Sequence, residues 1–133
     1  MPLEIPERKR PTDDSGYLEE LTRAIFQAGF SWRVIRDKWP NFRRAFDNFE
    51  IEAVAGYGEP DIERLVADAG IVRNRRKIEA TISNARTMWD LCQEHGTFHQ
   101  YLRSLDSMDY AGRRKELSSR FKNLGPTGVF TFL

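Results

Sequence analysis

Apolar positions recur along the chain every three or four residues, in short segments separated by glycine, proline and capping residues. This spacing places apolar side chains on one face of an α-helix. The clearest case spans residues 74–94, where the steps are four, three, four and three: Ile78, Ile82, Ala85, Trp89 and Cys92. No segment shows the sustained period of two that a half-buried β-strand needs. The pattern predicts an all-α protein of about eight short helices.

Capping and breaking residues set the ends of these helices. Asp13, Asp14 or Ser15 caps the first helix, which ends at Gly29, and Trp39-Pro40 stops a second one that starts after Ser31. Further helices are predicted over residues 41–48, 51–55, 60–70, 74–94, from 98 onward and 110–121. Residues 1–12 hold three of the six prolines. We therefore expect an irregular arm over 1–12 and one helical domain over 13–133.

Composition mainly excludes classes of protein. Of 133 residues, 40% are hydrophobic and 12% aromatic, which is enough to build a folded core. No apolar run approaches the roughly 18 residues of a membrane span, and the N-terminus lacks the apolar core of a secretory signal. The single cysteine, Cys92, cannot form an internal disulfide. We expect no membrane association and a reducing cytoplasmic location.

The net charge is only +1, but the charges are segregated along the sequence. Residues 47–68 contain seven acidic side chains and one basic one, whereas residues 113–122 contain five basic and one acidic. A second basic cluster spans residues 73–77. Such segregation favours a polyanionic partner on one side of the molecule. The cluster at 73–77 has two interpretations, because its side chains can face DNA or tie helix ends together.

The sequence lacks the residue patterns of metal, nucleophilic or phosphate-loop chemistry. His95 and His99 are four residues apart, but Gly96 interrupts the helix between them, and no supporting ligand has metal spacing. Cys92 suits a core position better than a nucleophile. We expect neither a metal nor a cofactor.

Two segments resemble the signature blocks of a known family. They are Ala28-Gly-Phe-Ser-Trp32 and the run from Asp68 to Ile78, which is followed by Ser83-Asn-Ala85. Both resemble the 3-methyladenine DNA glycosylase I (Tag) family of the helix-hairpin-helix superfamily, and residues 41–46 and 121–128 match in register. The resemblance implies a compact helical bundle with a C-terminal helix-hairpin-helix element. It also implies a monofunctional DNA N-glycosylase of base-excision repair.

The resemblance assigns roles at the first signature block. Trp32 corresponds to the aromatic platform on which an extruded base stacks, as enzymes that act on a flipped base require. Gly29 and Phe30 correspond to the wedge that fills the gap left in the duplex. The alternative for Trp32 is a buried position in the core.

The resemblance also places a phosphate-binding hairpin at the C-terminal end. Gly125, Thr127 and Gly128 belong to this hairpin, where glycine allows close backbone approach and N–H groups at a helix start bind anions. Lys122 adds sequence-independent attraction to phosphates. The same residues also suit an ordinary turn between helices.

The sequence departs from the family at the base pocket. Nothing matches the N-terminal Tyr-His-Asp-x-Glu-Trp-Gly block, the family's pocket carboxylate falls on Ala24, and the C-terminal zinc ligands would lie beyond Leu133. The chain is thus interpreted as a divergent member, truncated at its C-terminus, and zinc is not expected. Tyr17, Glu20 and Ala24 share one helix face. Glu20 is the candidate catalytic substitute with Tyr17 as a second ring; otherwise they are a solvated Glu and a core-edge Tyr.

Three functions remain open at this point. The first is excision of an alkylated purine such as 3-methyladenine from double-stranded DNA, by a monomeric cytoplasmic enzyme that is nucleoid-associated if bacterial. The second is a catalytically inactive DNA-binding relative that retains only the helix-hairpin-helix scaffold. The third is a helical interaction module unrelated to DNA.

Overall fold

The computed structural model describes the backbone of residues 5–122 and the side chains of residues 15–122. Over this range the chain is all-helical, which confirms the predicted fold class. The α-helices are α1 (Ile5–Gln27), α2 (Trp32–Ala45), α3 (Ile51–Ala55), α4 (Glu59–Val66), α5 (Arg75–His95), α6 (Phe98–Ser104) and α7 (Tyr110–Arg120), with a 3-10 turn, η1 (Asp47–Phe49), after α2. The predicted hairpin of residues 124–128 lies outside the described residues. None of the described helices is long and apolar enough to cross a membrane.

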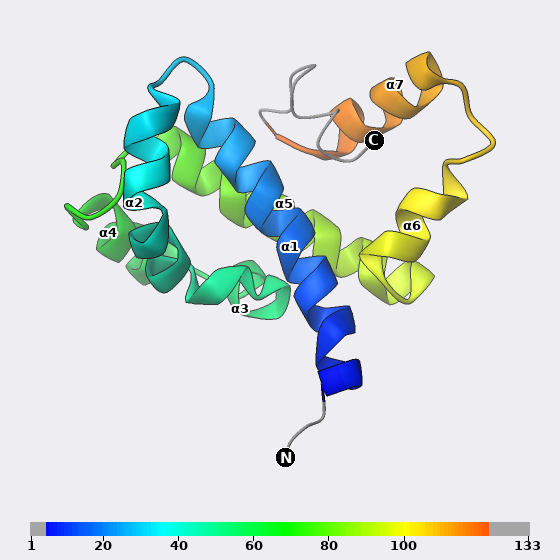
Figure 1. Ribbon diagram of the computed structural model, residues 1–133, viewed down its shortest axis with the longest axis horizontal. Coiled ribbons are helices and arrows are strands. Elements are labelled where there is room, and N and C mark those ends of the chain that lie inside the picture. Colours follow the sequence, from blue (N-terminus) through cyan, green and yellow to red (C-terminus); the bar gives the residue numbers. More distant parts are fainter. Residues whose placement is uncertain (1–4, 123–133) are drawn as a thin grey trace.

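Helix α5 is the centre of the fold. It packs against α1, α3, α4 and α6. In Figure 1, α1 crosses α5, with α2, α3 and α4 on one side and α6 and α7 on the other. The buried face of α5 begins as predicted but continues through Met88 and Leu91, whereas Trp89 is 37% exposed and Cys92 is half-buried. A 3.6-residue period fits both continuations, so the sequence pattern alone could not choose between them.

Aromatic rings fill the core where α2 and η1 meet. Trp39 stacks on Phe42 and on Phe49, with ring centroids 4.8 and 5.4 Å apart. Phe46 lies 5.5 Å from Phe49 in the same stack. The three phenylalanines are fully buried, which confirms their predicted place in the core.

Helix α2 continues through Pro40, so the predicted break at Trp39-Pro40 is wrong. A proline inside a helix removes one backbone hydrogen bond and disfavours a helical conformation at the residue before it. The stacked Trp39 ring and the burial of Phe42 and Ala45, about one and two turns later, offset this cost. One longer helix therefore replaces the two short ones predicted.

Helix α1 begins at Ile5, so the predicted irregular arm is wrong for residues 5–12. Pro6 is in the first turn, where the missing N–H has no helical partner to lose, whereas Pro11 lies inside the helix and removes one backbone hydrogen bond. The run from Glu7 to Arg10 consists of good helix formers. The helix propensity of the residues between the prolines therefore outweighs the helix-breaking preference of the prolines themselves.

Side chains of α4 and α5 complete the ends of other helices. Arg64 donates to the carbonyl of Ala45 at the end of α2 (3.0 Å), and Arg86 donates to the carbonyl of Ala55 at the end of α3 (2.9 Å) and to that of Tyr57. The last carbonyls of a helix have no partner within it, and a cation also suits the helix dipole there. These arginines therefore stabilise the fold from within.

Glu116 links α7 to α6 and gives a pH-dependent contribution to stability. Its carboxylate accepts hydrogen bonds from Tyr101 (2.9 Å) and Arg120 (2.6 Å), and the Arg120 bond lowers the pKa of the carboxyl group. A folded-state pKa below the unfolded value of about 4.3 stabilises the fold above that pH, and the contribution is lost as pH falls through the folded pKa. We expect Glu116→Gln to be less stable than wild type in urea at pH 7, with the difference shrinking below about pH 4.3. A difference that stays constant with pH would contradict this role.

Candidate functional site

The turn between α1 and α2 presents two exposed aromatic side chains. Gly29 takes a φ of +70°, in the left-handed region where a side chain is strained, and reverses the chain. Phe30 follows with 48% of its surface exposed, and Trp32 starts α2 with 56% exposed. Ser31 caps α2 by accepting a hydrogen bond from the Val34 N–H. Trp32 is therefore not a core residue, and the predicted wedge and platform residues lie together on one turn.

Two arginines of α2 accompany the Trp32 ring. The guanidinium carbon of Arg36 lies 4.8 Å from the ring centroid and that of Arg33 lies 6.0 Å away. Cations over an indole ring are attracted by its electron-rich face. More than half of the Trp32 surface stays exposed with both arginines in place.

Lys77 of α5 holds the end of α1 and with it this turn. Its ammonium donates to the carbonyl of Ala28 (2.8 Å) and to that of Phe26 (3.4 Å), and burial lowers its pKa. Carbonyls in the last turn of a helix need such donors. Lys77 thus favours the interpretation that part of the 73–77 cluster ties helix ends together.

The predicted face of α1 is only partly directed toward this turn. Tyr17 points to α6, where its hydroxyl lies 3.0 Å from Nδ1 of His99 and its ring meets Phe98 edge-on. Glu20 is exposed and pairs with Arg23 at 2.9 Å. Ala24 is half-buried and lies three residues before Gln27, the last residue of α1. Along the helix axis this places Ala24 about 4.5 Å from the end of α1, whereas Glu20 is about 10 Å from it. Ala24 is thus the member of the predicted set nearest the turn.

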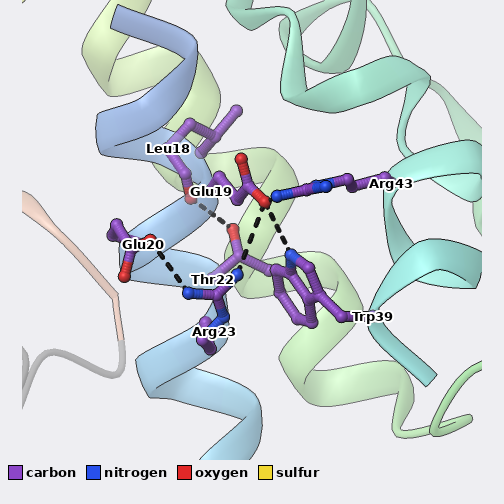
Figure 2. Close-up of polar contacts among 7 residues, drawn as sticks. All are labelled: Leu18, Glu19, Glu20, Thr22, Arg23, Trp39 and Arg43. Atoms are coloured by element: carbon purple, nitrogen blue, oxygen red, sulfur yellow. Dashed lines mark hydrogen bonds and ion pairs between the residues drawn. The ribbon is translucent and has the colours of Figure 1, made fainter. Parts of the chain in front are cut away.

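Glu19 is a polar anchor that the sequence analysis did not single out. Its side chain is 18% exposed, and its carboxylate accepts hydrogen bonds from the Trp39 indole and from Arg43, both at 2.7 Å. Figure 2 shows Glu19 directed toward α2 and Glu20 directed toward Arg23. Glu19 joins α1 to α2, the two helices that the exposed turn connects. A separation of 20 residues gives no sequence signal for such a contact.

Lys122 is exposed, and its backbone is fixed on α5. The fully buried Asn84 accepts from the Lys122 N–H (2.6 Å) and donates to the Lys122 carbonyl (3.1 Å). Asn84 belongs to the Ser83–Ala85 block that the sequence analysis singled out. Of the candidate phosphate-binding residues, Gly125, Thr127 and Gly128 lie outside the described residues.

Among the described side chains, no group of three or more His, Cys, Asp or Glu residues is arranged to hold a metal ion. His99 lies against Tyr17, and His95 is next to Tyr101, with ring centroids 5.3 Å apart. The described residues thus do not fit the family's zinc site, and we assign no step to a metal.

Comparisons to known proteins confirm the family resemblance and the fold. The chain belongs to the methyladenine glycosylase family, whose model matches residues 8–124. DNA-3-methyladenine glycosylase 1 of Escherichia coli K12 is 40% identical over 91 residues, which are 68% of this chain and 49% of that protein. The DNA-3-methyladenine glycosylase of Haemophilus influenzae is 35% identical over 78 residues, 58% of this chain and 42% of that protein. The chain spans about half the length of these curated relatives.

Solved structures show the same fold. The 3-methyladenine DNA glycosylase I of Staphylococcus aureus is 30% identical, with a TM-score of 0.77 over 90% of this chain and 74% of that one. A 3-methyladenine DNA glycosylase I in complex with 3-methyladenine is 31% identical, with a TM-score of 0.76 over 90% of this chain and 75% of that one.

Removing the Lys77 ammonium should loosen the α1–α2 turn. In Lys77→Met, we expect the amide protons of Ala28 and Phe30 to lose protection from hydrogen exchange by about 1.5–3 kcal/mol, the range for hydrogen bonds to a charged group. Lys115→Met, an exposed lysine on α7, is the matched control and should leave this protection unchanged. Unaltered exchange at Ala28 and Phe30 in Lys77→Met would show that Lys77 does not hold the turn.

Loss of the Glu19 carboxylate should destabilise the whole fold. Glu19→Ala leaves the indole N–H of the buried Trp39 without its acceptor, so we expect the free energy of unfolding in urea to fall by about 1–3 kcal/mol. Glu20→Ala, at the neighbouring exposed position, should change it by less than about 0.5 kcal/mol. Equal effects of the two substitutions would argue against Glu19 as the anchor.

Proposed function

We propose that this chain is a DNA glycosylase of base-excision repair that flips an alkylated purine of the 3-methyladenine type out of duplex DNA and hydrolyses its N-glycosidic bond. The observation that carries this proposal is the α1–α2 turn, which presents Phe30 and Trp32, two residues apart in sequence, both exposed to solvent. Membership of the methyladenine glycosylase family supports it. So do the relatives, which are DNA-3-methyladenine glycosylases.

In this proposal the turn separates the two tasks of base flipping. Trp32 stacks on the extruded base, an interaction worth about 1–3 kcal/mol. Phe30 enters the duplex and replaces the stacking that the flipped base has left. Lys122 attracts backbone phosphates regardless of sequence. Fixing the Lys122 backbone on α5 supports this role, because α5 also holds the turn through Lys77.

The chemistry asks little of the protein beyond positioning. Alkylation makes the purine cationic, so the bond to C1′ can break with its electron pair moving to the base, which leaves as a neutral purine. Water then adds to C1′ and loses a proton. Recognition of the base edge asks for a hydrogen-bonding group, and Ala24 supplies none. Glu20 is the nearest carboxylate on the predicted face and is our candidate for this role.

DNA binding without excision is the second candidate function. Two features concern base recognition: by the sequence resemblance Ala24 occupies the position of the family's carboxylate, and the Glu20 carboxylate pairs with Arg23. A chain with these features would keep the turn and the phosphate contacts while lacking base recognition. Assays of excision and of binding separate the two functions.

Excision is tested by measuring release of methylated purine from a methylated duplex. We expect the wild type to release 3-methyladenine and Trp32→Ala to lower kcat/KM by about 5- to 150-fold, the equivalent of about 1–3 kcal/mol of stacking. Because Trp32 is more than half exposed, its removal should leave the melting temperature nearly unchanged. Equal activity of wild type and Trp32→Ala would contradict the stacking role.

The role of a base-reading carboxylate is tested by substitutions at Glu20 and at Ala24, the two candidate positions on α1. If Glu20 reads the base, Glu20→Gln should reduce release of 3-methyladenine far more than duplex affinity, because it leaves phosphate contacts intact. Ala24→Glu should raise activity if only the carboxylate has been lost. A wild type that releases no base, together with an Ala24→Glu variant that also releases none, would leave DNA binding as the function.

A further inference from the structure

In the basic cluster of residues 73–77, some side chains are paired within the fold and others are exposed without a partner among the described residues. Arg75 turns to the acidic helix α4 and to its own helix, and is paired with Glu59 (2.8 Å), Glu79 (2.9 Å) and Glu63 (3.8 Å). Lys77 is engaged by the carbonyls at the end of α1. These two cations serve the fold and have little left to offer a ligand.

Arg73 and Arg76 are different. Both are exposed, and neither has a hydrogen-bond or ion-pair partner among the side chains and backbone that the structure describes. Their position is set by their neighbours, because Arg76 comes directly before Lys77, whose ammonium touches the Ala28 carbonyl one residue before Gly29. Arg76 is thus the neighbour of the lysine that holds the turn carrying Phe30, and Arg73 lies four residues before that lysine.

The surroundings of this turn combine exposed aromatic rings with cations. Arg33 and Arg36 lie over the Trp32 ring at the start of α2. Arg73 precedes α5 and Arg76 belongs to its first turn, next to the Lys77 that holds the α1–α2 turn. Aromatic rings interleaved with basic side chains are typical of surfaces that bind nucleic acid, where bases stack and guanidinium groups pair with phosphate.

We propose that Arg73 and Arg76 bind backbone phosphates of duplex DNA beside the point where Phe30 enters the base stack. The proposal rests on the proposed DNA-binding function and deepens it, because it adds a phosphate-binding surface on the α5 side of the turn to the one at Lys122. The ligand is the phosphodiester backbone, which both arginines can bind through two parallel N–H groups. Binding there is independent of the base sequence.

Salt dependence of duplex affinity measures these contacts directly. Each phosphate contact contributes about −0.9 to the slope of log K against log salt concentration. Wild type, Arg73→Gln/Arg76→Gln and Arg75→Gln are compared on one fluorescent duplex by anisotropy between 50 and 200 mM salt, about the range over which such contacts are lost. Arg75→Gln is the control, since it removes one positive charge from the same cluster at a position that is already ion-paired.

The double variant should have a slope shallower by about two, whereas Arg75→Gln should keep the wild-type slope. Both variants should show the wild-type circular dichroism spectrum, and Arg75→Gln should melt slightly earlier because Glu59 and Glu79 lose their partner. A steep wild-type slope that the double variant retains would overturn the inference alone. A wild type whose affinity is flat with salt would overturn both the inference and the proposed function.

Discussion

The carbonyl groups at the end of a helix need hydrogen-bond donors from outside that helix, and this requirement organises the fold. Helix α5 supplies Lys77 to the end of α1, Arg86 to the end of α3 and the Thr87 hydroxyl to the Arg120 carbonyl at the end of α7. One helix thereby fixes where three others stop. Several basic side chains that suggest a polyanionic partner in the sequence are internal donors in the structure.

The exposed turn follows from the same constraint. The two large apolar side chains of this turn are exposed to solvent, so they contribute no hydrophobic stabilisation to it. The turn therefore has to be held by contacts with neighbouring elements. Lys77 holds its backbone from α5, and Glu19 joins the two helices on either side of it through Trp39. Phe30 and Trp32 can remain exposed because polar contacts elsewhere keep α1 and α2 in place.

Much of the fold could be predicted from local patterns, and the failures have physical causes. The helical class, the α5 segment and the buried phenylalanines follow from periodicity. The helix break predicted at Pro40 is absent because tertiary packing of the aromatic stack outweighs the local helix-breaking preference of proline. At the site, the glycine turn and its aromatic residues were visible as a motif. The contacts of Glu19 and Lys77 were not, because they join residues 20 to 51 positions apart.

A titration with 3-methyladenine, followed by the tryptophan indole N–H signals in ¹H–¹⁵N correlation NMR spectra, tests most directly whether Trp32 is the platform for a base. The protein has three indole N–H groups, which respond separately: Trp32 on the turn, Trp39 bonded to Glu19, and Trp89 farther along α5. We expect the Trp32 signal to shift and saturate while the Trp39 and Trp89 signals stay in place. A Trp32 signal that does not move at saturating base, or a shift confined to Trp89, would contradict the proposed site.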